Sequence, residues 1–201
     1  MKLYYTPGAC SLSPHIILRE TGTPFELVKT DIGAKKTEDG RDFRTVNPGG
    51  YVPALELDDG TILTEGPAIT QYIADKAGAT YLAPAFGTIE RYKLISMLNF
   101  ISTELHKGFS PLFNPAMSED AKALARERLL ARIGVLDKQL ADKPYMMGKE
   151  FTLPDAYELT VLNWAKKLKV DLSPFQNIKD YQARILARPA VQEAMQAEGL
   201  I

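Results

Sequence analysis

The chain has 201 residues, of which 45% are hydrophobic, so it is long enough for one large domain or two small ones with a substantial core. Its formal net charge of −1 leaves no basic excess for binding a nucleic acid, and no stretch approaches the roughly 18 apolar residues of a membrane-spanning helix. Because a single cysteine cannot form an internal disulfide and the two histidines show no zinc-ligand spacing, we expect a cytoplasmic protein without a metal site, a membrane segment or a nucleic-acid partner.

The first 80 residues alternate between strand and helix signals. In chain order these are a strand at 2–5, a helix at 12–21, a strand at 25–30, a polar loop at 31–40, strands at 53–57 and 61–63, and a helix at 68–76. An Asp-Gly pair between the last two strands is typical of a tight hairpin turn. This order predicts a β-α-β unit followed by a β-β-α unit.

Cys10 lies where the first strand gives way to the first helix. The first N–H groups of a helix are unpaired, and together with the helix dipole they favour a nearby anion. A cysteine at this junction is therefore a candidate for a reactive thiolate. The alternative is a buried structural cysteine that takes no part in chemistry.

Pro53 opens the third strand, and we expect a cis peptide bond before it. A proline in this place removes a donor from the strand ladder, which leaves the backbone of Val52 able to pair with an extended peptide. The alternative is that Pro53 only begins an edge strand. Together with Cys10 at the first strand–helix junction, this order is the layout of a thioredoxin-like domain.

A stretch rich in Gly, Ala and Pro separates two halves of the chain, and no strand pattern follows it. We therefore expect domains at 1–80 and 87–201. Helical signals in the second half cover 88–107, 118–140, 152–164, 178–186 and 189–197. Thr152 and Asp155 have the spacing of a capping box at the start of the third of these helices. The second half is thus predicted to be an all-helical bundle.

Two stripes run along the first helix of this half. The apolar stripe consists of Leu94, Leu98, Ile101 and Leu105, at the spacing of one helix face. A neighbouring polar stripe consists of Asn99, Thr103 and His106. The first stripe is expected to face the core, and the second is a candidate for contact with a ligand.

Five separated motifs resemble those of the bacterial beta-class cytosolic glutathione transferases, along essentially the whole chain. They lie at 7–12, 47–55, 63–66, 99–107 and 151–157. The resemblance implies a thioredoxin-like α/β N-terminal domain, an all-α helical C-terminal domain and a homodimer. It also implies a detoxifying enzyme that joins the thiolate of glutathione to a small hydrophobic electrophile, with glutathione as co-substrate and no separate cofactor.

The resemblance assigns Cys10 and His106 to catalysis near the glutathione sulfur. Val52 would hold the cysteinyl residue of glutathione through its backbone, and Lys35 would meet the glycine carboxylate. The further glutathione-binding residues that it implies are Glu65, Gly66, Asn99, Thr103, Glu104 and Leu105, with Glu104 reaching the glutathione of the partner subunit. The carboxylate of Glu65 suits the γ-glutamyl ammonium group, and backbone N–H groups at a helix start suit its carboxylate.

Each of these assignments has a simpler alternative. Glu65 could be an ordinary first-turn acid of a helix, and Lys35 or Lys36 a solvated loop charge. His106 could only complete a hydrogen bond between domains. The residues Phe109, Leu112, Phe113 and Trp164 could line a pocket for the second substrate, or they could be plain core. His15 reads as a packing residue of the first helix.

Three functional hypotheses remain. In the first, a transferase, Tyr5 or Ser11 is an alternative to Cys10 as the group that orients the thiol. The second is a glutaredoxin-like thiol–disulfide reductase, because Cys10 and Ser13 form a monothiol version of a redox motif; thiol–disulfide or peroxidase chemistry through Cys10 could also accompany transfer. The third is a binding protein that kept the fold without the activity.

Overall fold

The computed structural model describes all 201 residues and divides into two compact units. Unit 1 comprises residues 1–80 and 188–201, and unit 2 comprises residues 81–187. We expected residues 188–201 in the helical domain, but their helix packs against the first helix of unit 1. Its apolar face, which includes Val191 and Ala194, is buried there, so the partner of this helix lies far away in the sequence.

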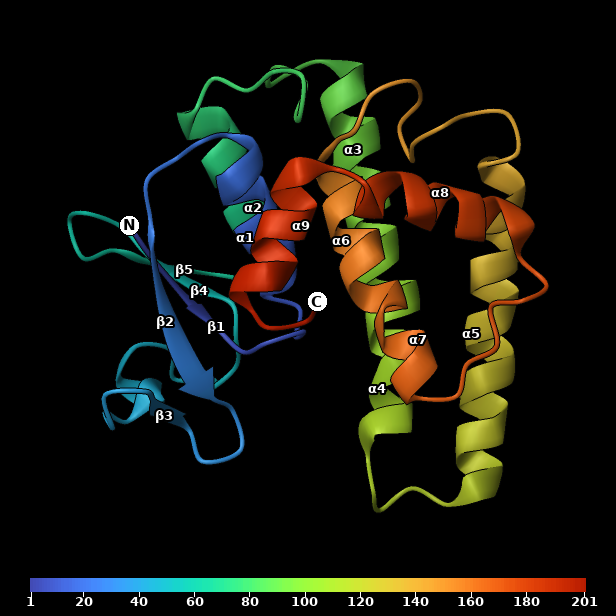
Figure 1. The fold of residues 1–201 in the computed structure, drawn as a ribbon, viewed down its shortest axis with the longest axis horizontal. Helices are drawn as coiled ribbons and strands as arrows, with labels where there is room; N and C mark the ends of the chain where they lie inside the picture. Colours follow the sequence, from blue (N-terminus) through green and yellow to red (C-terminus); the bar gives the residue numbers. More distant parts are fainter. The chain divides into compact units, whose positions relative to one another are not determined.

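Unit 1 is a mixed sheet with helices (Figure 1). Its elements are β1 (Lys2–Tyr5), α1 (Leu12–Glu20), β2 (Glu26–Asp31), β3 (Lys36–Thr37), a 3-10 turn (Phe43–Thr45), β4 (Ala54–Glu56), β5 (Ile62–Thr64), α2 (Gly66–Lys76) and α9 (Pro189–Ala197). The strand order is β3-β2-β1-β4-β5, with β1 and β2 parallel and the other neighbours antiparallel. This arrangement confirms the predicted β-α-β and β-β-α units and the thioredoxin-like fold.

The expected polar loop at 31–40 was wrong in part, because it contains the short strand β3. Thr37 of β3 lies opposite Thr30 of β2, and both side chains are buried although both are polar. Two residues are too few to produce an alternating apolar pattern, so this strand leaves no trace in the sequence.

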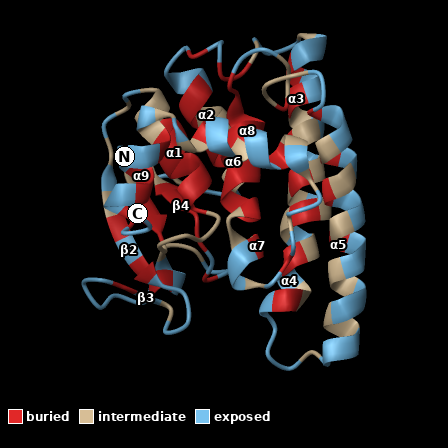
Figure 2. Cartoon of the chain, turned by 45° about the vertical axis from the view of Figure 1, so that its right-hand side comes forward, coloured by how far each residue is buried: buried red, intermediate tan, exposed pale blue.

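One face of the sheet carries a small apolar cluster that includes Val52, the residue before the proline that precedes β4. Its members are Tyr4, Val28, Phe43, Val52 and Ala54. The ring centroids of Tyr4 and Phe43 are 5.5 Å apart, so the 3-10 turn that contains Phe43 packs against β1. Figure 2 shows that buried residues also continue along α1. The segment containing Val52 is therefore held by packing as well as by the strand that follows it.

Unit 2 is entirely helical. Its elements are α3 (Ile89–Phe100), a π-helical segment (Ile101–His106), α4 (Lys107–Phe113), α5 (Glu119–Gln139), α6 (Leu153–Leu162), α7 (Trp164–Lys167) and α8 (Gln176–Leu186). The predicted end of the first helix near residue 107 is wrong, because the helical run continues to Phe113. Phe109 and Leu112 extend its buried face beyond the predicted end. None of the helices in either unit combines the length and apolar character that crossing a bilayer requires.

The predicted capping box of α6 is confirmed. Asp155 accepts hydrogen bonds from the backbone N–H and the hydroxyl of Thr152, each at 2.8 Å. The same carboxylate also accepts from the N–H of Met146 and from the hydroxyl of Tyr181. Asp155 thus joins the start of a fully buried helix to two other segments of unit 2.

Candidate active site

The thiol of Cys10 faces the segment that precedes β4. Its Sγ donates a hydrogen bond to the backbone oxygen of Val52 at 3.2 Å, and the side chain is half-buried. The peptide bond between Val52 and Pro53 is cis, as expected. Cys10 lies one residue before Ser11, the N-cap of α1. The expected position at a strand–helix junction is therefore confirmed, and the thiol points toward a backbone acceptor just before β4, a strand that pairs with both β1 and β5.

Ser11 and Tyr5, the alternative hydroxyl groups, have other partners. The Ser11 hydroxyl is fully buried and bonds to the backbone N–H and oxygen of Thr6, at 3.2 and 3.3 Å. The Tyr5 side chain is buried, and its ring centroid lies 6.3 Å from that of His15. Burial, with the negative charge of Glu198, raises the pKa of the Tyr5 hydroxyl. Neither hydroxyl shares the acceptor that Cys10 contacts.

Lys35 is attached to the segment just before Val52. Its Nζ donates to the oxygen of Gly50 at 2.7 Å and lies 4.6 Å from the ring centroid of Tyr51. Its backbone adopts a positive φ of 56°, which is uncommon for a residue other than glycine. Lys36, by contrast, is exposed. These two contacts hold the ammonium group of Lys35 next to Gly50 and Tyr51, whereas the alternative interpretation was a solvated loop charge.

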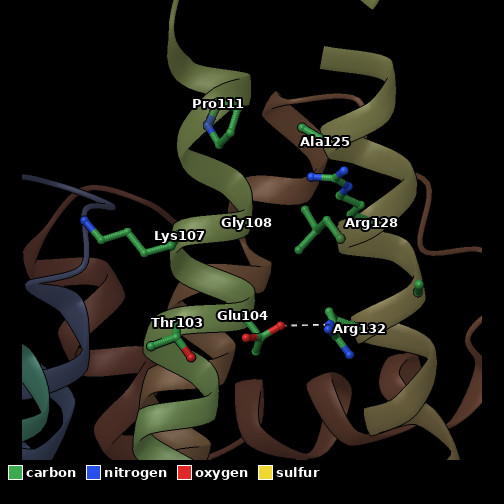
Figure 3. A pocket seen from close by; sticks show the side chains of 10 residues that line it. Thr103, Glu104, Lys107, Gly108, Pro111, Ala125, Arg128 and Arg132 are labelled. Carbon is green, nitrogen blue, oxygen red and sulfur yellow. Dashed lines mark ion pairs between the residues drawn. The ribbon is translucent and has the colours of Figure 1, made fainter. Parts of the chain in front are cut away.

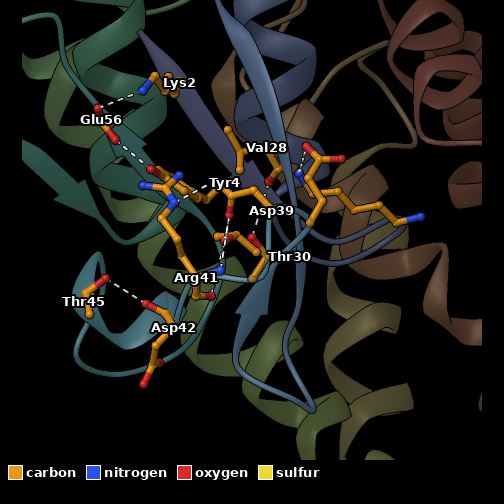
Figure 4. A network of polar contacts seen from close by, with 12 residues as sticks. Lys2, Tyr4, Val28, Thr30, Asp39, Arg41, Asp42, Thr45 and Glu56 are labelled. Carbon is orange, nitrogen blue, oxygen red and sulfur yellow. Dashed lines mark hydrogen bonds and ion pairs between the residues drawn. The ribbon is translucent and has the colours of Figure 1, made fainter.

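Figure 4 shows polar contacts within the sheet and within the loop that follows Lys35. The Tyr4 hydroxyl donates to Glu56 at 2.7 Å, and Lys2 pairs with the same carboxylate at 3.3 Å. In the adjoining loop, Arg41 donates to Asp39 at 2.7 Å. The loop itself is joined to the sheet by the backbone pairing of Thr37 with Thr30 of β2.

Glu65 and Gly66 form the start of α2. Glu65 is exposed and has a φ of 67°, and its side chain makes no cap hydrogen bond. The N–H groups of Ala68 and Ile69 bond to the backbone oxygen of Glu65, and Pro67 has no N–H. Gly66 therefore supplies the N–H at the very start of the helix, beside the carboxylate of Glu65. An exposed acid can bind an ammonium group, and an N–H at a helix start can bind a carboxylate. Together they are complementary to the end of a peptide that carries both groups.

In unit 2, His106 is the last residue of the π-helical segment. Its Nδ1 lies 2.7 Å from the hydroxyl of Tyr157, and its ring centroid lies 5.0 Å from that of Trp164. Burial, with the positive charge of Lys107, lowers the pKa of His106 to about 4. The imidazole is therefore neutral at pH 7. When the Tyr157 hydroxyl donates to Nδ1, the ring proton lies on Nε2, which is then a donor.

Tyr157 is a site residue that the sequence reasoning missed. It lies in α6, a helix whose residues are all buried, and its spacing does not distinguish it from the other core residues of that helix. Only the fold shows that its hydroxyl reaches a histidine 51 positions earlier.

The aromatic residues expected to line a second-substrate pocket gather around Trp164. The ring centroids of Phe109 and Phe113 lie 5.8 and 5.4 Å from that of Trp164, both edge-on. Phe113 is 45% exposed and Trp164 is partly exposed, whereas Phe109 and Leu112 are buried. Of these four residues, only Phe113 and Trp164 are exposed in part. The buried ring of Phe109 packs against Trp164.

The remaining predicted residues lie along α3 and the π-helical segment. Asn99 and Thr103 are exposed, and the Thr103 hydroxyl donates to the backbone oxygen of Asn99 at 3.0 Å. Leu105 is fully buried, in keeping with its place on the apolar stripe. Glu104 accepts from Nε of Arg132 at 2.7 Å.

Thr103 and Glu104 line a groove of about 580 Å³ between this helical run and α5 (Figure 3). Lys107, Arg128 and Arg132 also line it, and Figure 3 shows Glu104 and Arg132 facing each other across the groove while the Lys107 side chain points away from α5. The groove therefore carries an excess of positive charge.

Comparison with known proteins identifies the family of both parts of the chain. Residues 8–76 match the family model described as the glutathione S-transferase N-terminal domain, and residues 100–189 match the glutathione S-transferase C-terminal domain. The chain is 48% identical over 200 residues to the glutathione S-transferase GstA of Escherichia coli O157:H7, with full coverage of both chains.

Two solved structures, among others, align with this chain over the full length of both proteins. The bacterial beta-class glutathione S-transferase of Sphingomonas chungbukensis is 50% identical, with a TM-score of 0.97. A sphingomonad glutathione S-transferase complexed with glutathione is also 50% identical, with a TM-score of 0.96. On these motifs, this fold and these similarities, the chain belongs to the glutathione S-transferase family and resembles its bacterial beta class along its entire length.

Proposed function

We propose that this glutathione S-transferase conjugates the glutathione thiolate to small hydrophobic electrophiles, as a cytoplasmic detoxifying enzyme. Enzymes of this family use glutathione as a co-substrate and need no further cofactor. The observation that carries the proposal is the 3.2 Å contact between the Cys10 thiol and the oxygen of Val52, because it places the sulfur at the backbone that would bind a peptide.

Three groups of unit 1 match the parts of glutathione. The backbone of Val52 would pair with the cysteinyl residue in an extended conformation. The ammonium of Lys35, held at Gly50, would meet the glycine carboxylate, and Glu65 with the N–H of Gly66 would hold the γ-glutamyl end. A sphingomonad relative that is 50% identical was solved in complex with glutathione, which supports glutathione as the ligand.

Activation of the thiol would use Cys10 and His106 together. When glutathione binds, the single proton of the Cys10 thiol would turn from the oxygen of Val52 to the glutathione sulfur, and neutral His106 has Nε2 as a further donor. Lowering the pKa of the glutathione thiol by two units needs roughly 2.7 kcal/mol, which two donors to an anion can supply. The thiol proton leaves to solvent. The thiolate sulfur then bonds to the electrophilic carbon, and the leaving group departs with the electron pair.

The electrophile would contact the exposed aromatic surface of Phe113 and Trp164. Holding both reactants side by side makes their encounter effectively unimolecular. This proximity would accelerate conjugation in addition to the stabilisation of the thiolate. Because apolar rings provide the contact, we expect a preference for aryl and other apolar electrophiles over charged ones.

We further propose a homodimer, in which the groove lined by Thr103 and Glu104 faces a second copy of the chain. Glu104, now paired with Arg132, would then reach toward the glutathione of the partner subunit. Size measurement in solution, combined with Glu104→Gln and Arg132→Gln variants, tests this assembly.

The experiment that tests the function is a substrate panel. Glutathione is combined with an aryl halide, a hydroperoxide or a small mixed disulfide, and the wild type is compared with Cys10→Ala and with Ser13→Ala as a matched control in the same helix turn. Conjugation of the aryl halide that falls in Cys10→Ala and persists in Ser13→Ala is the expected result. Absence of conjugation by the wild type would contradict the proposal.

Thiol–disulfide exchange is a second candidate activity, favoured by the half-buried Cys10 thiol, which is the only cysteine of the chain. The Cys10 thiolate would attack the glutathionyl sulfur of a mixed disulfide, form a Cys10–glutathione disulfide and release the substrate thiol. A second glutathione thiolate would then release oxidised glutathione and restore Cys10. Intact mass under non-reducing conditions would show one added glutathione that dithiothreitol removes, and Cys10→Ala would show none.

A further inference from the structure

The carboxylate of Glu198 is buried near the end of the chain and contacts the loop that carries Cys10. Its Oε2 accepts a hydrogen bond from the backbone N–H of Gly8 at 2.8 Å. Its Oε1 lies 2.9 Å from Nδ1 of His15, and both side chains are completely buried. A single acidic group thus joins the C-terminal end of unit 1 to the Cys10 loop and to α1.

The protonation of this cluster follows from its donors. Arg19 donates from Nε to Nε2 of His15 at 3.3 Å, so Nε2 carries the lone pair and the ring proton lies on Nδ1. His15 therefore donates to Glu198, and the two carboxyl oxygens of Glu198 accept from His15 and from Gly8. His15, read from the sequence as a packing residue, is buried as expected but also belongs to this hydrogen-bonded chain. Tyr5 is the other titratable side chain beside Glu198, and its pKa is raised in part by the charge of Glu198.

Helix α9, which ends just before Glu198, packs against α1 and is held there at both of its ends. Arg188, just before α9, forms a two-pronged pair with Glu20 at 2.7 and 2.9 Å. At the other end of α9, Leu200 packs over Gly8, where an added Cβ would lie 3.3 Å from Cδ2 of Leu200. The carboxylate of Glu198 therefore has little freedom to move away from Gly8.

Gly8 lies two residues before Cys10 and has a φ of 69°, a conformation that suits glycine. Between them, the N–H of Ala9 bonds to the oxygen of Thr6, which closes the turn. Any rotation of the Gly8 peptide would therefore move Cys10 relative to Val52.

We propose that Glu198 is a positioning residue that holds the Cys10 thiol against Val52 through the N–H of Gly8. The proposal rests on the proposed function for its catalytic consequence. Glu198 contacts the N–H of Gly8, two residues before Cys10, so its effect would reach the sulfur through the backbone of the loop.

The test compares Glu198→Gln with Glu193→Gln. The amide of Gln has one oxygen, so it can accept from Gly8 or from His15 but not from both, and its NH2 group faces the other donor. Glu193 is the matched control, because it is an exposed carboxylate on the same helix α9 and pairs with Arg19 at 3.4 Å. The primary measurement is the rate at which iodoacetamide alkylates Cys10, as a function of pH and without glutathione.

We expect Glu198→Gln to change the alkylation rate of Cys10 at pH 7 by on the order of tenfold and to shift its pH profile, because a buried donor loses its partner. It should lower kcat for aryl halide conjugation more than it raises the KM for glutathione. Glu193→Gln should match the wild type in both measurements. Glu198→Asp, which keeps the charge but withdraws it from Gly8, should act in the same direction as Glu198→Gln.

A lower Tm in Glu198→Gln and Glu198→Asp with unchanged alkylation and unchanged kcat per folded molecule would show a purely structural role and overturn the proposal. Equal effects of Glu193→Gln would overturn it as well. Because alkylation is measured without glutathione, these outcomes are distinct from failure of the proposed function, in which the wild type would not conjugate glutathione at all.

Discussion

The thiol of Cys10 and the backbone oxygen of Val52 lie 3.2 Å apart and form a hydrogen bond. This contact joins the loop before α1 to the segment before β4, two regions separated by 42 positions in the chain. A peptide that pairs with the backbone of Val52 must approach this same oxygen, which has two lone pairs. The cysteine of the protein and the cysteinyl residue of glutathione would therefore meet at one place.

Replacement of Lys35 should weaken glutathione binding. Lys35→Ala removes the ammonium group held at Gly50, and the lost pair with a carboxylate should raise the KM for glutathione by about tenfold, with a small change in kcat. Steady-state kinetics at several glutathione concentrations measures the effect. Lys36→Ala is the control because Lys36 is the neighbouring, exposed lysine, and an equal rise in the KM of Lys36→Ala for glutathione would contradict the assignment.

Glu65 is expected to show opposite effects on stability and binding. Its φ of 67° is strained for a residue with a side chain, so Glu65→Gly should raise the free energy of unfolding by about 1 kcal/mol. The same change removes the carboxylate and should raise the KM for glutathione. Urea unfolding and kinetics test the two halves. Glu65→Gln keeps the strain, and if it left the KM unchanged, the role of the charge would be refuted.

The stability of the protein should depend on His106 between pH 6.5 and 4. Burial, with the charge of Lys107, lowers the pKa of His106 from 6.5 to about 4, so in this range the unfolded chain binds a proton that the folded chain does not. The stability contributed by the neutral ring is fully present above pH 6.5 and falls as the pH decreases toward 4. Urea unfolding at a series of pH values should show a shallower slope for His106→Asn than for the wild type.

In NMR titrations, the His106 ring signals, assigned by their loss in His106→Asn, should remain unshifted down to about pH 5. A titration midpoint near 6.5 would contradict the buried, neutral imidazole on which the proposed donor role depends.

Glu158 should destabilise the protein at neutral pH. Its carboxyl group is completely buried, and burial, with the charge of Asp155, raises its pKa well above the usual value. The penalty is absent below the unfolded pKa and grows as the pH rises above it. Glu158→Gln should therefore raise the free energy of unfolding at pH 7 by about 1 to 3 kcal/mol, and the difference should vanish below pH 4.

Glu127→Gln is the matched control for this measurement, since Glu127 is an exposed carboxylate of α5. A stability gain that is the same at pH 7 and pH 4 would show that the effect of Glu158→Gln does not arise from charge burial.

Local patterns predicted much of the fold. The stripe of Leu94, Leu98, Ile101 and Leu105 is buried as its spacing requires, and the strand at 2–5 has its predicted bounds. The position of Cys10 and the cis bond before Pro53 also followed from residue order. These features depend on interactions within a few residues, which periodicity and turn chemistry record.

Other features depend on residues that are distant in the sequence. The contacts of His106 with Tyr157 and of Glu198 with Gly8 span 51 and 190 positions, and no periodic signal marks such pairs. The placement of α9 in unit 1 has the same origin, because an apolar helix face does not specify its partner. The π-helical segment, in which the helix accommodates an extra residue per turn, also leaves no signature in side-chain character.

The most direct test of the account is an ultraviolet titration of the thiolate of glutathione bound to the wild type, Cys10→Ala and Ser13→Ala. The account predicts that glutathione bound to the wild type and to Ser13→Ala ionises well below the pH at which free glutathione does. In Cys10→Ala the midpoint should move upward by about one unit, which corresponds to roughly 1.4 kcal/mol for one lost hydrogen bond to the sulfur. An unchanged midpoint in Cys10→Ala would contradict the role assigned to the thiol at Val52.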